Sequence, residues 1–422
     1  MRRIKALFQR LCYMQSAVLL TAVLGGTAVY SVRFPVFIKA EDAVETVKET
    51  KLQTAPGEPS NLYAQSACLM DAGSGRVLFE KNADKEMPMA STTKIMTLIV
   101  TLENADLEDV VTVSSLAARQ PDVQLNIREG EKYYLKDLVY SLMLESHNDV
   151  AVAIAEHVGG SVEGFAALMN KKAEELGCVH THFVTPNGLD ADGHYTTAVE
   201  LARIASYAIQ NKKFIEITNQ PNWNFKEIES GRSFSVSNKN KLLYLMDDAI
   251  GIKTGFTGKA GYCFVGAVKE EDKTLVSVVL ACGWPPNKNY KWADTQKLMS
   301  YGLDNFQFKD IFEHGKTFAP VPVTDGQKGT VNLEIRADNG EKMVSEKEIS
   351  LPMLVRTDEK VKVVYDVPDG LTAPVGKDIK AGSVKYYVGG QLIQEYGIYT
   401  LDEVKKIDYR WCLEKIWNRF LF

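Results

Sequence analysis

The chain has 422 residues, of which 45% are hydrophobic and 24% are charged, and its formal net charge is -5. This length is sufficient for two domains with cores of their own, and the composition is that of an ordinary globular protein. No basic region with interleaved aromatic residues is present, which argues against a nucleic-acid partner.

The first 40 residues are interpreted as an export segment. Four basic residues, Arg2, Arg3, Lys5 and Arg10, precede an apolar run over 11–32. A charged region followed by an apolar one is typical of a signal peptide, but this run also approaches the length of a membrane span. A cleaved signal peptide and a retained membrane segment therefore both remain open.

Residues 41–60 are acidic and contain prolines, and they are interpreted as a linker. The pattern over 61–315 predicts one α/β (α+β) domain with an antiparallel sheet and a helical insertion. The expected sheet strands lie at 67–71, 76–80, 251–254, 262–268 and 274–282. The expected helices lie at 135–144, 149–160, 161–177, near 201–208 and at 290–306. Short alternating runs separated by turns over 316–398 predict a small all-β, sandwich-like domain.

Neither a metal nor a cofactor is expected. The six cysteines include no Cys-x-x-Cys pair, so a zinc site has no support. His180 and His182 are placed on an expected strand at i and i+2, but no third ligand is evident. His147 is interpreted as a packed or solvent-facing side chain.

Ser91 and Lys94 are the first candidate catalytic pair, because Ser91 is the only serine with a lysine three positions later. In a helix beginning at Ser91, residues i and i+3 lie on one face. A serine hydroxyl is a weak nucleophile unless a base is close, and a lysine with a lowered pKa is such a base. An ordinary helix N-cap is the alternative interpretation.

Two further patterns occur once each, in the order that supports a catalytic role. Ser146-His147-Asn148 interrupts two expected helices, and Lys253-Thr254-Gly255 lies on an expected strand. A glycine there permits the close approach of another backbone. Together the three motifs resemble those of the penicillin-recognising serine enzymes.

The closest resemblance is to the low-molecular-weight penicillin-binding proteins, the serine-type D-alanyl-D-alanine carboxypeptidases. It extends from about Leu62 to the C-terminus and includes the loop at 183–189 and the segment His194-Tyr195-Thr196-Thr197-Ala198. The resemblance implies a bacterial enzyme of the cell wall space or the outer face of the cytoplasmic membrane. Its partners would be peptidoglycan stem peptides and, as covalent inhibitors, β-lactam antibiotics.

The resemblance also implies the catalytic roles. Ser91 would attack the carbonyl between two D-alanines, Lys94 would act as the base, and Ser146 would pass a proton to the leaving group. The oxyanion would lie between the backbone N–H groups of Ser91 and Phe256.

Substrate-binding roles are implied for the remaining motif residues. Asn148 would hold a substrate carbonyl or side chain, while Lys253 and Thr254, next to Gly255, would bind the terminal carboxylate. The positive charge of Lys253 would also help to keep Lys94 neutral. Lys239 is a candidate for a second carboxylate contact, although its segment is one residue shorter than expected.

Three other functions remain open on this scaffold or a similar one. A D,D-endopeptidase or transpeptidase would use the same motifs. A β-lactamase is disfavoured because no deacylating glutamate is apparent, although the loop at 185–198 contains Asp190 and Asp192. A non-catalytic, penicillin-sensing wall-binding protein is disfavoured by the complete motif set.

The C-terminal segment, 399–422, is expected to be an amphipathic helix. At 100° per residue its apolar face is formed by Cys412, Leu413, Ile416, Trp417, Phe420 and Leu421. Such a helix suits the surface of an anionic membrane. Packing on the β-domain is the alternative.

Overall fold

The computed structural model describes residues 57–338 and 343–420. The expected export segment, 1–40, and most of the expected linker, 41–60, lie outside these described residues. Within them, no helix is long and apolar enough to cross a membrane.

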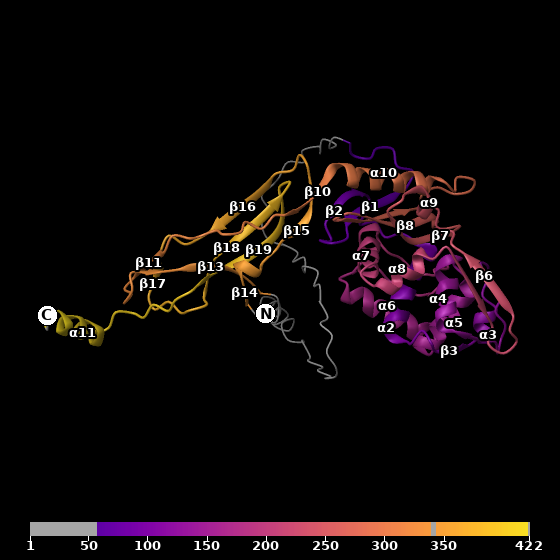
Figure 1. Cartoon of the computed structure of the whole chain (residues 1–422), viewed down its shortest axis with the longest axis horizontal. Coiled ribbons are helices and arrows are strands. Elements are labelled where there is room, and N and C mark those ends of the chain that lie inside the picture. Colours follow the sequence, from indigo (N-terminus) through magenta and orange to yellow (C-terminus); the bar gives the residue numbers. More distant parts are fainter. Residues whose placement is uncertain (1–56, 339–342, 421–422) are drawn as a thin grey trace, which may run out of the picture. The chain divides into compact units, whose positions relative to one another are not determined.

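A five-stranded antiparallel sheet forms the centre of the N-terminal domain (Figure 1), as the sequence predicts. The strand order is β2-β1-β9-β8-β7, so β7 lies at one edge. The strands are β1 (Ser66–Asp71), β2 (Val77–Lys81), β7 (Ala249–Thr257), β8 (Gly261–Glu270) and β9 (Lys273–Leu280).

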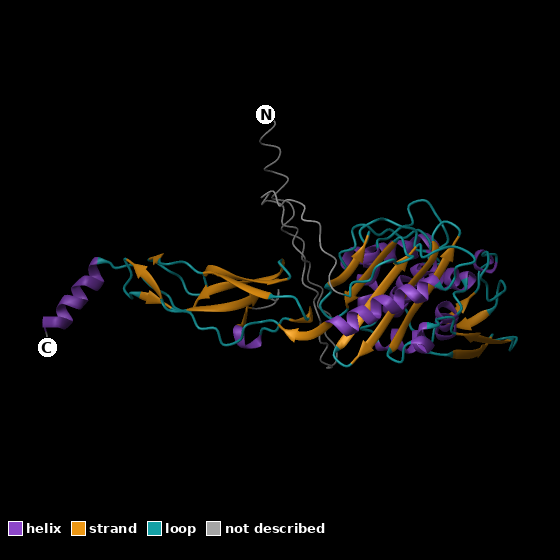
Figure 2. Ribbon diagram, turned by 90° about the horizontal axis from the view of Figure 1, so that it is seen from above, coloured by secondary structure: helices purple, strands orange, loops and turns teal. Residues whose placement is uncertain are grey.

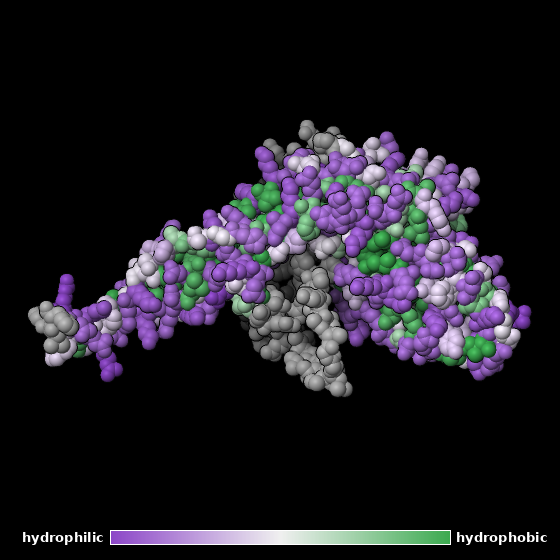
Figure 3. All heavy atoms as spheres, in the orientation of Figure 1, coloured by the Kyte–Doolittle hydropathy of each residue, from purple (hydrophilic) through white to green (hydrophobic). Residues whose placement is uncertain are grey.

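Helices cover both faces of this sheet. Helix α10 (Tyr290–Asn305) lies across one face, where it packs against β8 and β9 (Figure 2). The other face carries the helical insertion. Its helices are α2 (Lys94–Asn104), α3 (Ser115–Ala118), α4 (Leu135–Leu144), α5 (Asn148–Gly159), α6 (Val162–Glu175), α7 (Ala198–Ala208) and α8 (Lys212–Asn219). The outer surface of this domain is mainly hydrophilic on the face seen in Figure 3.

Several short elements complete the domain. The sequence interpretation missed two small two-stranded antiparallel sheets, although the strands of one of them, Asn222–Lys226 and Ser233–Ser237, alternate regularly between polar and apolar residues. The additional elements are β3 (Val110–Thr112), β4 (Lys132–Tyr134), β5 (Asn222–Lys226), β6 (Ser233–Ser237) and α9 (Leu242–Leu245).

Two local predictions are wrong. The helix expected at Ser91 begins at Lys94, and Ser91 lies in a preceding 3-10 turn, η1 (Ala90–Thr93). The strand expected at His180 and His182 is a loop, in which His182 makes one isolated bridge to Tyr195.

The C-terminal β-domain has a core that includes Ile335, Val384 and Ile398, and it confirms the predicted all-β class. Its largest sheet has the order β14-β13-β19-β18-β16. The strands from β10 onward are β10 (Phe306–Asp310), β11 (Val321–Thr324), β12 (Thr330–Val331), β13 (Leu333–Asp338), β14 (Met343–Ser345), β15 (Pro352–Arg356), β16 (Val361–Asp366), β17 (Leu371–Thr372), β18 (Lys380–Val388) and β19 (Gln391–Thr400), with the 3-10 turn η2 (Glu346–Glu348) before β15.

The C-terminal helix, α11 (Tyr409–Phe420), is shorter than expected. Residues 401–407 are held by backbone hydrogen bonds to the β-domain, including Leu401 N to Asn332 O and Ile407 N to Asp325 O. Asp408 then accepts a hydrogen bond from the N–H of Trp411, which starts the helix there.

Candidate active site

The turn that carries Ser91 places its hydroxyl beside Lys94. Lys94 is the first residue of α2, and its Nζ lies 3.0 Å from Ser91 Oγ. Ala90, immediately before Ser91, is buried and has a φ of 49°, a left-handed conformation that is costly for a residue with a Cβ. The surrounding structure must therefore hold this turn in place.

Lys94 is fully buried, and its Nζ has two further partners. It lies 2.9 Å from Asn148 Oδ1 and 2.6 Å from the carbonyl oxygen of Asn187. Burial lowers the pKa of Lys94 well below its ordinary value; the charge of Lys253 adds to this effect and Asp149 opposes it. The sequence predicted the contribution of Lys253, but burial is the larger cause.

The neutral amine fits these three neighbours. A neutral lysine has two N–H donors and one lone pair, and the oxygens of Asn148 and Asn187 can only accept. In the neutral form the two N–H groups would point to these oxygens and the lone pair would face Ser91, whose hydroxyl also lies 3.3 Å from the carbonyl oxygen of Asn187.

Ser146 lies between α4 and α5, as the sequence predicts. Its φ is 73°, and its buried Oγ has no hydrogen-bond partner among the described residues. A buried hydroxyl without a partner is costly, and such groups are concentrated at functional sites.

Both the oxygen and the nitrogen of the Asn148 side-chain amide form hydrogen bonds within the protein. Its Oδ1 accepts from Lys94, and its Nδ2 donates to the carbonyls of Pro121 and Asp122 at 3.1 and 3.0 Å. In this arrangement Asn148 orients the amine of Lys94, which differs from the expected contact with substrate.

Strand β7 brings Lys253, Thr254 and Gly255 to the same site. Lys253 is 2% exposed, and burial, followed by the charge of Lys291, lowers its pKa to about 7. A Cβ on Gly255 would lie 2.9 Å from the backbone nitrogen of Ser91, so only glycine allows this approach of β7 to η1. Phe256, the next residue, is 43% exposed.

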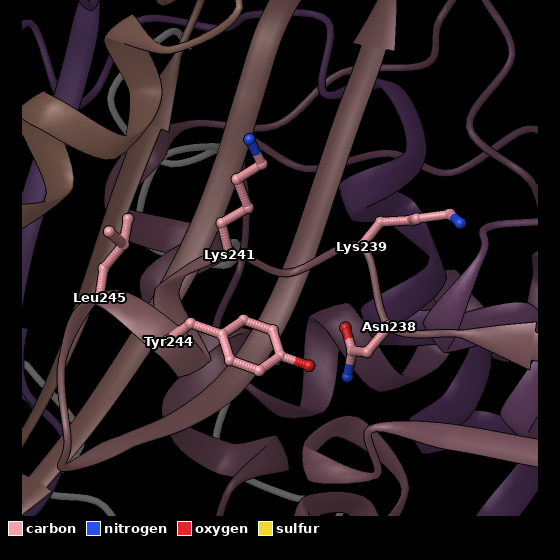
Figure 4. Close-up of a pocket in the computed structure, with 5 residues that line it drawn as sticks. All are labelled: Asn238, Lys239, Lys241, Tyr244 and Leu245. Atoms are coloured by element: carbon pink, nitrogen blue, oxygen red, sulfur yellow. The ribbon is translucent and has the colours of Figure 1, made fainter.

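Lys239 lies at the edge of the site, where it forms an ion pair with Glu145 (2.8 Å) next to Ser146. It also lines an open pocket of about 440 Å³ together with Asn238, Lys241, Tyr244 and Leu245. The side chains of Lys239 and Lys241 diverge around this pocket (Figure 4). A substrate carboxylate at Lys239 would have to compete with Glu145.

Sequence reasoning missed three contributors to the site. Asn187 acts through its backbone carbonyl, a role that no side-chain motif reveals. Asp149 accepts hydrogen bonds from the N–H groups of Leu125 and Ile127 and so holds the segment beside Asn148. Lys291, on α10, is buried, and its pKa is lowered to about 8, mainly by burial.

In the part of the chain that the structure describes, no group of three or more His, Cys, Asp or Glu side chains is placed to hold a metal ion. His147 is packed, as one interpretation of the sequence held: its Nδ1 lies 2.8 Å from Ser141 Oγ, and it is 4% exposed.

Comparison with known proteins identifies the family of the chain. The family model described as D-alanyl-D-alanine carboxypeptidase matches residues 51–283. The chain belongs to this family. A second model, the C-terminal domain of penicillin-binding protein 5, matches residues 306–406. Membership confirms the class predicted from the three motifs, a serine-type D-alanyl-D-alanine carboxypeptidase and penicillin-binding protein.

Relatives match this carboxypeptidase over most of its length. D-alanyl-D-alanine carboxypeptidase DacA of Escherichia coli (strain K12) is 30% identical, over 88% of this chain and 92% of its own. DacF of Bacillus subtilis (strain 168) is 28% identical, over 85% of this chain and 90% of its own. The structure of penicillin-binding protein 5 from Haemophilus influenzae superposes with a TM-score of 0.66 at 28% identity, over 82% of this chain and 99% of the other. These matches favour neither a β-lactamase nor a non-catalytic protein.

Proposed function

We propose that this protein removes the terminal D-alanine from peptidoglycan stem pentapeptides through an acyl-enzyme on Ser91. The observation that carries the proposal is the buried amine of Lys94, 3.0 Å from the hydroxyl of Ser91. β-Lactams would acylate the same hydroxyl and remain as covalent inhibitors.

In the acylation step, Ser91 Oγ attacks the carbonyl carbon between the two D-alanines while its proton passes to Lys94. The developing oxyanion is stabilised by the backbone N–H groups of Ser91 and Phe256. The close approach of Gly255 to the nitrogen of Ser91 supports this assignment, because it brings the two segments together.

The carbon–nitrogen bond then breaks, and the leaving amine of D-alanine takes a proton from Ser146. The unpartnered hydroxyl of Ser146 supports this role, since it is free to exchange protons with substrate and Lys94. Lys94 passes the proton that it took from Ser91 to Ser146 and is then neutral again. In the second step Lys94 accepts a proton from water as the water oxygen attacks the acyl carbonyl, and it returns this proton to Ser91 Oγ as the ester bond breaks.

Lys253 and Thr254 bind the terminal carboxylate of the substrate. A pKa of about 7 leaves Lys253 partly neutral before binding, and the carboxylate would favour its charged form. Asn148 belongs in this proposal as the residue that orients Lys94. Lys239 contributes positive charge at the edge of the site rather than a direct contact with the substrate carboxylate, because its ammonium already donates to Glu145.

The test is Ser91→Ala, assayed by labelling with a fluorescent penicillin and by release of D-alanine from a pentapeptide. We expect both signals to disappear while the thermal unfolding curve is retained. Covalent labelling of the folded Ser91→Ala protein would exclude Ser91 as the nucleophile. An unlabelled, inactive wild-type protein would refute the proposed function itself.

We further propose that the enzyme is exported and that α11 associates with an anionic membrane surface. The support is the exposure of its apolar side chains: Leu413, Ile416 and Trp417 are 47%, 54% and 70% exposed. Lys405, Lys406 and Arg410 add positive charge before and at the start of the helix.

The membrane proposal is tested with two forms that both lack residues 1–40, one ending at Ile407, after the segment that is bonded to the β-domain, and one retaining its tail. We expect only the form with the tail to float with anionic liposomes, while both hydrolyse substrate equally. If neither form binds the liposomes, the proposal is wrong. Loss of activity on truncation would instead favour a helix that packs on its own protein.

A further inference from the structure

His194 lies in the interior between the nucleophile turn and the loop at 184–194. Its side chain is 7% exposed, and its two ring nitrogens contact different segments. The backbone N–H of Val184 donates to Nδ1 at 3.0 Å, and Nε2 lies 2.8 Å from the hydroxyl of Thr93. Thr93 lies within the Ser91–Lys94 motif, at one of its two unspecified positions, whereas Val184 lies outside all three motifs.

The hydrogen-bond partners determine the tautomer of His194. Because the Val184 N–H donates to Nδ1, that nitrogen carries no proton, and the proton is on Nε2. Nε2 therefore donates to Thr93 Oγ1, and the Thr93 hydroxyl donates to the carbonyl of Ala90 at 2.8 Å. Burial, with a smaller contribution from His182, lowers the pKa of His194 to about 4, so the ring is neutral at neutral pH.

This hydrogen-bond chain joins the segment next to Ser91 to the loop that contacts Lys94. At one end is Ala90, whose left-handed backbone immediately precedes Ser91. At the other end is the loop that presents the carbonyl of Asn187 to Lys94 Nζ at 2.6 Å. The loop and the turn are in close contact at Gly188, where a Cβ would lie 2.0 Å from the oxygen of Ala90.

We propose that His194 is a positioning residue for acylation, which couples the nucleophile turn to the loop carbonyl that orients the Lys94 amine. If the loop moves, the Asn187 carbonyl no longer takes one N–H of the amine, and the lone pair of Lys94 turns away from Ser91. This inference rests on the proposed function, since it assumes that Ser91 is acylated with Lys94 as the base.

The test compares His194→Leu, His194→Gln, Thr93→Val and the double variant His194→Leu/Thr93→Val. Leucine fills similar space but has no polar atoms. Glutamine offers one acceptor for Val184 and one donor for Thr93. His314→Gln is the matched control, because the His314 side chain is 54% exposed and lies far along the chain from either contact. The measurement is the second-order rate of acylation by a fluorescent penicillin as a function of pH.

We expect His194→Leu to lower the acylation rate by about 10- to 100-fold, the scale of a misplacement of about 1 Å at a reacting centre. We also expect its acid limb to move to higher pH, because an opened loop would admit water to Lys94 and raise the pKa. That pKa is otherwise set by burial, Lys253 and Asp149. A loss of packing alone would lower stability without moving the limb. His194→Gln should restore most of the acylation rate. In the double variant, the rate losses of His194→Leu and Thr93→Val should not add.

A folded His194→Leu protein with the wild-type rate and acid limb would overturn the inference, and so would a His194→Gln protein as slow as His194→Leu. If His194→Leu does not fold, Thr93→Val decides, since it removes only the hydroxyl and an unchanged rate would overturn the coupling. Failure of the proposed function is distinguishable, because wild-type protein would then not be labelled at all.

Discussion

Replacing Lys94 by methionine tests whether the buried amine is neutral in the folded protein. In the unfolded chain the amine has its ordinary pKa of 10.5, whereas in the folded protein the pKa lies well below that value. Between these two pKa values the unfolded state binds one proton more than the folded state. The free energy of unfolding must therefore rise with pH in this window.

The magnitude follows from the same linkage. One proton corresponds to about 1.4 kcal/mol per pH unit, and this is the slope with which the free energy of unfolding of wild type should rise while the pH lies between the folded and unfolded pKa values of Lys94. Lys94→Met removes this contribution to the pH dependence of the free energy of unfolding. It also removes the hydrogen bonds to Asn148 and Asn187, but that loss is a constant offset across pH. Wild type should therefore gain stability relative to Lys94→Met as the pH rises through this window, by about 1.4 kcal/mol per pH unit.

The assay is urea unfolding followed by tryptophan fluorescence at several pH values. Lys171→Met is the matched control, because the Lys171 side chain is 74% exposed on α6. Its stability should run parallel to wild type across the pH range. If Lys94→Met also runs parallel, Lys94 retains its proton in the folded protein, and its assignment as a base is refuted.

Two further variants probe the residues around the amine. Lys253→Arg should move the alkaline fall in kcat/KM to higher pH for a peptide with a free carboxylate. The reason is that arginine stays charged, whereas the pKa of Lys253 is about 7. An alkaline limb that does not move in the pH–rate profile would contradict this role for Lys253. Ser146→Ala should slow acylation by about 10²- to 10⁴-fold. It should change the urea midpoint no more than a surface substitution does, since the buried Oγ has no hydrogen-bond partner to lose. A large loss of stability would show that the hydroxyl is structural.

The fold was predictable where the hydrophobic pattern was strong. The central strands follow from short apolar runs that are buried on both faces, whereas the helices of the insertion and the all-β C-terminal domain follow from helical or alternating periodicity. The wrong predictions fall where tertiary contacts override the local pattern. Residues 401–407 look like the first turns of a helix, but they are bonded to the β-domain. His180 and His182 alternate as in a strand, yet no neighbouring strand is there to pair with both.

The candidate site was predictable in its side chains but not in its backbone. Ser91, Lys94 and Lys253 stand in recognisable motifs, because their chemistry requires those residue types. The carbonyl of Asn187 has no such signature, since any residue supplies the same oxygen. Its position depends on Gly188, which fits against Ala90 only without a Cβ. The internal contacts of Asn148 were not predictable for a related reason: the partners of its Nδ2, the carbonyls of Pro121 and Asp122, are also backbone atoms.

These backbone contacts explain how the protein can hold an unprotonated lysine at neutral pH. Burial alone would make Lys94 neutral but would leave its lone pair free to rotate. Two acceptors that cannot donate, one from α5 and one from the loop at 184–194, fix both N–H groups and so direct the lone pair to Ser91. Lys253 then adds repulsion against a proton on Lys94 until a carboxylate arrives to balance its own charge. The same lysine that binds the substrate therefore helps to keep the base in its reactive form before the substrate binds.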